Sequence, residues 1–141
     1  MAQKETVGTV MTRDPKVLES SAPLTDAARA MRESDIGDVI VIEDGSVCGI
    51  ATDRDIVVRG IALGKDPSTT RLDEISSRDV TTVSPDMPVE EAIQLMRDRA
   101  VRRLPVVDGD RPVGVISLTD LAMERNPSSV LSDIKKAPPN D

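Results

Sequence analysis

An internal repeat constrains this chain more than any other feature. Residues 10–55 align with residues 75–120 without a gap, at a constant offset of 65 positions. The residues that punctuate helices and strands are in register, among them Pro23 with Pro88, Ala27 with Ala92 and Asp55 with Asp120. Chance does not explain such a match, so the chain is expected to fold as two copies of one supersecondary unit.

Each copy carries a Gly-x-x-Ser/Thr-x-x-Asp stretch. Its members are Gly49, Thr52 and Asp55 in the first copy and Gly114, Ser117 and Asp120 in the second. The apolar run after the glycine predicts a strand end, and the hydroxyl and the acid predict a helix start. Two interpretations stay open. The pair caps the helix and complements its dipole, or it binds a ligand; the two roles are compatible.

Composition limits the classes of function. The chain has 141 residues, of which 38% are hydrophobic and 30% charged, as in a soluble globular protein. Its net charge of −7 and the lack of a long basic run argue against nucleic acid. No run of about 20 apolar residues predicts a membrane span. With no secretory signal and only Cys48, a cytoplasmic protein is expected.

Two residue classes are missing. The chain has no histidine, which is the commonest general base and metal ligand, and it contains no Walker loop and no metal-ligand cluster. An enzyme is therefore not expected. The chain also has no Phe, Tyr or Trp, so a site for a nucleobase would hold the ring with aliphatic side chains and backbone groups. A core without aromatic side chains is built from small aliphatic ones, and a partner subunit is one way to complete it.

Each copy predicts the order strand, helix, strand, strand, helix. The first copy predicts a helical turn at 6–11, strands at 16–18, 38–43 and 47–51, and helices from Pro23 and from Thr52 to about Gly60. The second predicts a short helix at 71–76, strands at 81–83, 103–107 and 113–117, and helices at 88–99 and 119–125. Hairpin turns are expected at Asp44-Gly45 and at 108–110. The predicted domains are repeat 1 at 6–61, a linker at 62–70, repeat 2 at 71–126 and a tail at 127–141. Within the tail we expect a helical turn at 130–136 and a frayed end.

The long helix of each copy has one apolar face. These faces comprise Leu24, Ala27, Ala28 and Met31 in the first copy and Val89, Ala92, Ile93 and Met96 in the second.

The repeated element order, the two Gly-x-x-Ser/Thr-x-x-Asp stretches and the run Val101–Val107 before Asp108-Gly109 resemble the CBS domain family. The resemblance covers residues 6–125 and is specifically to a tandem pair, or Bateman module, standing alone. It implies an α/β (α+β) fold of two β-α-β-β-α repeats packed through their sheets with pseudo-twofold symmetry. It also implies a disc-like homodimer, for which the two helix faces would supply contacts.

The resemblance further implies two clefts for adenosine-containing ligands, namely AMP, ADP or ATP and, less readily, NAD or S-adenosylmethionine. Carried over by position, one cleft would comprise Ile50, Thr52, Arg54, Asp55, Ser76, Asp79, Thr81, Val101 and Arg102. The other would comprise Met11, Asp14, Lys16, Ile36, Gly37, Val115, Ser117, Thr119 and Asp120. The carboxylates would accept the ribose hydroxyls, and Ile50 and Val115 would contact the base.

The two expected clefts are chemically unequal. Arg54 is matched by Thr119, and Gly37 of the first copy is matched by Arg102 of the second. The Thr52–Asp55 cleft therefore has more positive charge, with Arg54 as its phosphate cation. The leading hypothesis is a regulatory module that senses adenine nucleotides and signals through a homodimer to an unidentified protein partner. The alternative is a ligand-free dimeric interaction scaffold.

Overall fold

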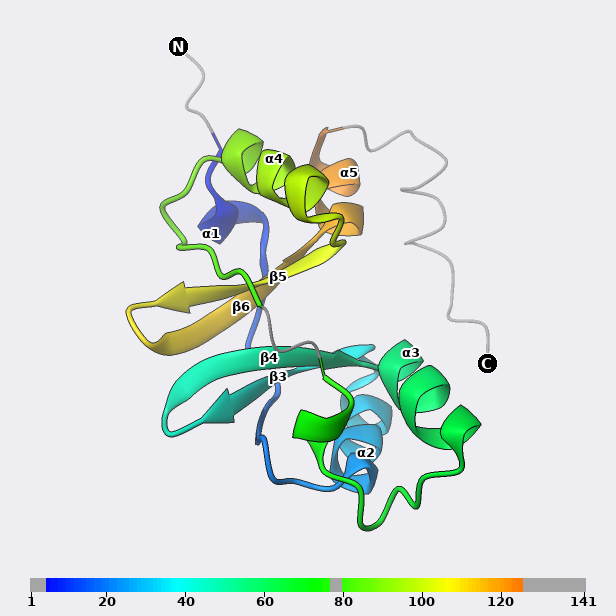
Figure 1. Ribbon diagram of the computed structural model, residues 1–141. Helices are drawn as coiled ribbons and strands as arrows, with labels where there is room; N and C mark the ends of the chain where they lie inside the picture. Colours follow the sequence, from blue (N-terminus) through cyan, green and yellow to red (C-terminus); the bar gives the residue numbers. More distant parts are fainter. Residues whose placement is uncertain (1–4, 77–79, 126–141) are drawn as a thin grey trace. The chain divides into compact units, whose positions relative to one another are not determined.

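The computed structural model describes residues 5–76 and 80–125 (Figure 1). The helices are α1 (Val7–Val10), α2 (Leu24–Ser34), α3 (Asp53–Asp55), α4 (Val89–Arg99) and α5 (Leu118–Arg125). The strands are β1 (Thr12–Arg13), β2 (Val17–Glu19), β3 (Asp38–Glu43), β4 (Ser46–Thr52), β5 (Arg103–Asp108) and β6 (Arg111–Ser117). The mixed α+β class expected from the sequence is confirmed. The segments expected at 130–136 and 137–141, and Asp79, lie outside the described residues.

The offset between the two copies reappears in the structure. Helices α2 and α4 begin and end at equivalent positions, as do β3 and β5, and β4 and β6. The inward-facing positions of each strand pair are the same as well. One sheet has the strand order β2-β3-β4, with β2 parallel and β4 antiparallel to β3, and the other has the order β1-β6-β5. The predictions for the long helix and the hairpin of each copy are thereby confirmed, whereas the short helix expected at 71–76 is a 3₁₀ turn, Leu72–Glu74.

The two hairpins are closed by two-residue turns of different types. Asp44 and Gly45 both have positive φ, 53° and 80°, as a type I′ turn requires. In the second hairpin only the first central residue, Gly109, has positive φ, at 66°, which is the type II′ arrangement. Both turns have two central residues and suit the right-handed strand twist, so the two hairpins have strands of matching length although the glycine has moved by one position.

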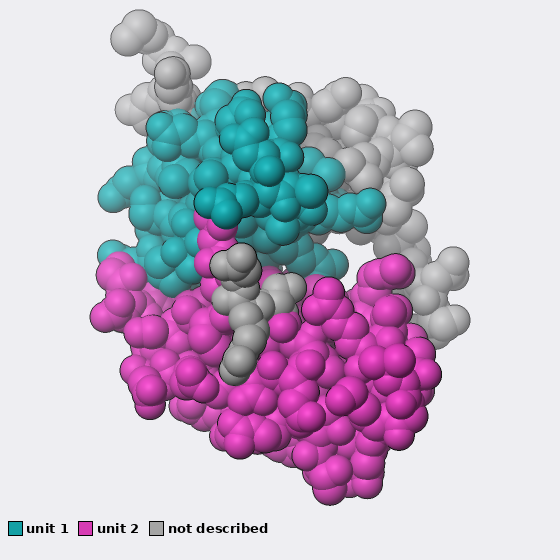
Figure 2. Space-filling view, viewed as in Figure 1, with its two compact units in different colours: residues 1–13, 82–108, 113–141 teal, residues 14–81, 109–112 magenta. Residues whose placement is uncertain are grey.

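The compact units of the chain do not follow the order of the repeats. One unit contains residues 1–13, 82–108 and 113–141, and the other contains residues 14–81 and 109–112 (Figure 2). The start of the first repeat, residues 5–11, therefore packs with the second repeat. The segment at 70–76, expected to introduce the second repeat, packs with the first. We call these the first lead segment (residues 5–11) and the second lead segment (residues 70–76).

Backbone hydrogen bonds hold the first lead segment to the second repeat. The Val7 and Gly8 amides donate to the carbonyls of Met87 and Pro85 at 2.8 and 2.9 Å. The Val89 amide, the first of α4, donates to the carbonyl of Glu5 at 3.1 Å.

The second lead segment makes the equivalent bonds to the first repeat, each at the positions that the repeat alignment matches. The Leu72 amide donates to the Ala22 carbonyl at 2.9 Å, and the Leu24 amide at the start of α2 donates to the Thr70 carbonyl at 2.9 Å. The exchange of lead segments is thus reciprocal.

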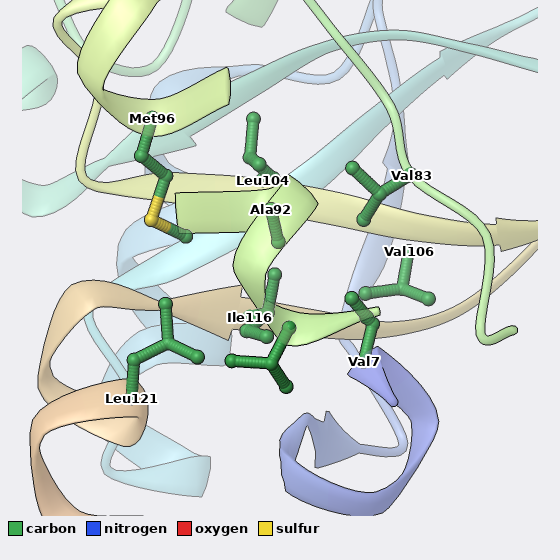
Figure 3. Packing of buried hydrophobic residues seen from close by; sticks show 9 residues of the cluster. Val7, Val83, Ala92, Met96, Leu104, Val106, Ile116 and Leu121 are labelled. Carbon is green, nitrogen blue, oxygen red and sulfur yellow. The ribbon is translucent and has the colours of Figure 1, made fainter. Parts of the chain in front are cut away.

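Each lead segment also supplies apolar side chains to a core. Val7 of α1 packs in one cluster with Val89, Ala92 and Met96 of α4 and with residues of β5 and β6 (Figure 3). Leu72 and Ile75 are 0% and 1% exposed, in the cluster formed by α2, β3 and β4. Most of each helix face is therefore covered within its own unit, and the expected homodimer contacts of these faces stay a prediction.

Several local predictions need correction. Ala28 is exposed, because Leu24, Ala27 and Met31 define the buried stripe of α2 and Ala28 lies at its edge. Ile93, also expected to face inward, is half-buried against its cluster. The strand expected at 81–83 is reduced to one isolated parallel bridge between Val83 and Val106.

The helix expected from Thr52 to Gly60 is not uniform. After α3 it continues as a π-helical turn, Ile56–Gly60, and then as a 3₁₀ turn, Ile61–Leu63, inside the expected linker. A Cβ added at Gly60 would lie 2.8 Å from Cδ1 of Leu24, so the missing side chain lets this turn approach α2.

The rest of the connector is ordered by short-range polar contacts. Asp66 accepts hydrogen bonds from the backbone and the hydroxyl of Ser68, and the bond from the hydroxyl is the main cause that lowers the pKa of Asp66. Arg71 pairs with Asp73 at 2.7 Å, and this contact raises the pKa of Arg71. The connector therefore delivers the second lead segment in a defined conformation.

We expect Leu72→Ala to destabilise the protein by about 2–5 kcal/mol, because it leaves a cavity in the first repeat's core. Urea unfolding followed by circular dichroism measures this. Cys48 packs against the same core, so its reaction with a thiol reagent should also accelerate. The control is Leu63→Ala, since Leu63 is 68% exposed. Equal stability of the two variants would contradict the exchange of lead segments.

A second expectation concerns the end of α4. Ala100 has φ 54° and ψ 42°, a left-handed conformation that costs an L-residue free energy. Ala100→Gly should therefore stabilise the protein by about 0.5–1 kcal/mol. The same substitution at Ala28, inside α2, should destabilise it by about 0.5–1 kcal/mol. Thermal unfolding of both variants tests whether the signs differ.

Candidate functional site

The Thr52–Asp55 pair forms a reciprocal capping box at the start of α3. The Asp55 amide donates to Oγ1 of Thr52 at 3.0 Å, and the Thr52 amide donates to Oδ2 of Asp55 at 2.9 Å. Thr52 ends β4, whose pairing with β3 fixes the direction in which the chain enters the helix. The capping interpretation is therefore confirmed for this pair.

The Ser117–Asp120 pair repeats this geometry where β6 leads into α5. The Asp120 amide donates to Oγ of Ser117 at 3.0 Å, and the Ser117 amide donates to Oδ2 of Asp120 at 3.2 Å. The backbone before each box is equivalent too. The Leu118 amide donates to the Arg102 carbonyl at 2.8 Å, as the Asp53 amide does to the Gly37 carbonyl at 3.0 Å.

A third polar group joins the second box. The hydroxyl of Thr12 donates to Oδ2 of Asp120 at 3.4 Å. Strand β1 brings Thr12 there by pairing antiparallel with β6, with Thr12 opposite Val115 and Arg13 opposite Gly114. A Cβ at Gly114 would lie 2.7 Å from the Thr12 carbonyl oxygen, so glycine makes this pairing possible. Thr12 was not among the site residues predicted from the sequence, although hydroxyl residues occupy both matching positions, Thr12 and Ser77.

The first box has a cation as its neighbour. Nε of Arg59 lies 3.9 Å from Oδ1 of Asp55, and Nη1 of Arg59 donates to the Ile75 carbonyl at 3.4 Å. The cation predicted from the sequence was Arg54, and Arg59 was not among the predicted site residues. The spacing i to i+4 from Asp55 on a helix was the available signal. Among the described residues, the Arg54 side chain is exposed and makes no hydrogen bond or ion pair.

The remaining expected site residues are divided between the units. Ile50, Ser76 and Thr81 belong to the unit of the first box, together with Asp14, Lys16, Ile36 and Gly37. Met11, Val101, Arg102, Val115 and Thr119 belong to the unit of the second box. Ile50 and Val115 are only 8% and 6% exposed, so each offers a ligand little surface. The assignment of these residues to two clefts stays a prediction.

Two general properties of the described chain bear on what the boxes can do. No three His, Cys, Asp or Glu side chains in residues 5–76 and 80–125 gather as a metal site would need. In the same part of the chain, no helix has the length and apolar character to cross a membrane. What each box does offer is a carboxylate beside a hydroxyl, a pair that can accept hydrogen bonds from a polar ligand and donate one to it.

Comparison with known proteins identifies the family. The family model of the CBS domain matches residues 7–60 and again residues 72–126. The chain belongs to the CBS domain family. The CBS domain-containing protein YhcV of Bacillus subtilis is 36% identical over 115 residues, which are 82% of this chain and 81% of that protein.

Solved CBS structures have the same fold. A putative signal-transduction protein with CBS domains from Burkholderia ambifaria has a TM-score of 0.77 at 28% identity, covering 88% of this chain and 96% of that one. A CBS domain pair solved with 5′-methylthioadenosine and S-adenosyl-L-methionine has a TM-score of 0.79 and covers 90% of this chain and 100% of that one. Its 24% identity makes it a likeness of fold.

We expect Thr52→Ala and Ser117→Ala each to destabilise the ligand-free CBS pair by about 0.5–2 kcal/mol, because each removes the acceptor of a capping bond. Urea unfolding measures the loss. Thr69→Ala is the control, since Thr69 is exposed and its hydroxyl makes only a 3.5 Å bond to the Asp66 carbonyl. Unchanged stability of both box variants would show that the hydroxyls do not cap these helices in solution.

Proposed function

We propose that this CBS pair is a regulatory module that binds adenosine-containing ligands, of the AMP, ADP and ATP class, at its two capping boxes. The observation that carries the proposal is the duplication of a hydroxyl–carboxylate pair at equivalent strand-to-helix junctions. The side chain of Asp55 is 17% exposed although its Oδ2 caps α3. Such a carboxylate can still accept hydrogen bonds from a ribose diol. Capping orients the acid beforehand, so ligand binding has little further side-chain entropy to lose.

Ligand binding can be converted into a signal because each box is linked by side-chain contacts to an exchanged segment or to the strand that follows one. Thr12 reaches Asp120 from β1, which directly follows the first lead segment, and Arg59 reaches Ile75 of the second. A ligand that binds one arrangement of these segments better than another shifts the population toward it. No chemical step is part of the proposal, and the chain lacks the histidine that most acid–base chemistry would use.

A homodimer that acts on a partner protein is the second part of the proposal. Its support is an exposed apolar segment after α3. Val57, Val58, Ile61 and Leu63 are 57%, 45%, 51% and 68% exposed. Four large apolar side chains so close together in the chain are typical of a surface that another protein covers. The expected setting is the cytoplasm.

A ligand-free dimeric scaffold is the alternative, and one observation favours it. Both box carboxylates already have a structural role, because each accepts a backbone hydrogen bond from its own hydroxyl residue. The boxes would then exist for folding alone. Sedimentation of the purified protein, with and without nucleotide, separates the two functions, since a scaffold dimerises without responding to ligand.

The decisive experiment uses the absence of aromatic residues. Purified protein should absorb almost nothing near 260–280 nm, so a band near 260 nm reports a bound nucleotide, and mass spectrometry of the acid-released material identifies it. For protein freed of ligand, we expect AMP, ADP or ATP to raise the unfolding temperature. At a ligand concentration 100 times Kd, the free energy of unfolding should increase by about 2.7 kcal/mol.

Asp55→Ala and Asp120→Ala should each reduce the ligand-induced rise, measured from the variant's own ligand-free unfolding temperature, and the double variant should abolish it. The control is Asp26→Ala, which removes an exposed acid from the first turn of α2. If neither bound nucleotide nor a thermal response to AMP, ADP, ATP, NAD or S-adenosylmethionine is found, the sensor function is wrong and the scaffold remains.

A further inference from the structure

Arg59 makes two long polar contacts and is largely exposed. Its side chain is 56% exposed, whereas that of Asp55 is 17% exposed. The ion pair with Asp55 spans 3.9 Å, and the hydrogen bond to the Ile75 carbonyl spans 3.4 Å. Both lie at the long end of the useful range. A guanidinium has five N–H donors in a planar fork. Arg59 therefore stands beside the first box with donors that a ligand can engage.

The electrostatics of the first box require such a group. An anionic ligand that placed its hydroxyls on Asp55 would bring a second negative charge close to the carboxylate. That repulsion opposes binding unless a cation lies between the charges. Arg59 already lies beside Asp55, with its Nε 3.9 Å from Oδ1, and guanidinium geometry suits a phosphate group.

The second repeat lacks this cation in its sequence. The 65-residue offset, continued past the aligned stretch, places Glu124 at the position equivalent to Arg59, on α5 and about one helical turn after Asp120. The spacing from the capping acid is thus the same, but the charge at that position is reversed. The two boxes, alike in their hydrogen bonds, differ in the sign of the charge that follows the acid along the chain.

We infer that Arg59 is the anion-binding residue of the first box and makes this box select phosphorylated over unphosphorylated adenosine ligands. This inference rests on the proposed function and adds the residue that distinguishes charged from uncharged ligands. The phosphate draws the guanidinium away from the Ile75 carbonyl. Ile75 itself is 1% exposed and held in its core, so the side chain of Arg59 is the part that moves.

The test compares the affinities for AMP and adenosine by titration calorimetry. It uses the full chain carrying Asp120→Asn, which weakens the second box so that binding at the first box is measured. The parent should bind AMP at least about tenfold more tightly than adenosine, as one charge-assisted hydrogen bond provides. Arg59→Gln should abolish that preference and leave the affinity for adenosine within about twofold. Arg59→Lys, which keeps the charge, should retain a preference for AMP.

Two matched variants serve as comparisons. Arg29→Gln removes a guanidinium that pairs with Asp26 on the exposed face of α2, at 3.8 Å, and should leave the preference intact. Arg54→Gln removes the cation favoured by the sequence and should have the smaller effect. The inference is overturned if Arg54→Gln, and not Arg59→Gln, abolishes the preference.

The remaining outcomes are also decisive. Loss of both ligands in Arg59→Gln at an unchanged unfolding temperature would contradict the inference, because selection by charge must spare adenosine. If Arg59→Gln retains the preference for AMP, the inference about Arg59 is overturned but the proposed function is not. If the unsubstituted chain binds neither AMP nor adenosine, the proposed function fails, and the role of Arg59 fails with it.

Discussion

Two backbone hydrogen bonds determine how this chain can fold. Helices α2 and α4 are preceded by Pro23 and Pro88, which provide no side-chain acceptor for the helix start. The first amide of each helix instead donates to a carbonyl of the exchanged lead segment, at Thr70 or Glu5. Helix-start amides left without an acceptor are costly when buried. Without the exchanged lead segment, the first amide of each helix would therefore lack its hydrogen-bond acceptor.

The same exchange positions the candidate site. Strand β1 follows the first lead segment and brings Thr12 to Asp120, while the second lead segment presents the Ile75 carbonyl to Arg59. The hairpins β3-β4 and β5-β6 direct the two boxes. Folding and the proposed ligand binding thus share groups, since the capping carboxylates are those that a ribose would contact. Evolution of such a site is constrained, because an acid that recognises a ligand also holds its helix.

The regular elements were predictable because their signals are local. Helix periodicity, prolines at helix starts and glycine in the hairpin turns act over a short stretch of chain, and the repeat gave each signal twice. The errors came where tertiary contacts decide. Val83 forms only a bridge to Val106, and Ala28 lies at the edge of the apolar stripe. The π-helical turn depends on how closely Gly60 approaches Leu24, which no local pattern reveals.

By itself, the sequence determined the duplicated α+β architecture, the capping boxes and the charge difference between the copies, because these depend on residue type and short spacing. Only the tertiary structure decided which segment completes which core, and it alone brought Thr12 to Asp120 and Arg59 to Ile75. Two similar repeats offer nearly equivalent pairing partners for each lead segment. The choice between them depends on packing between segments that lie far apart in the chain, beyond the reach of any local pattern.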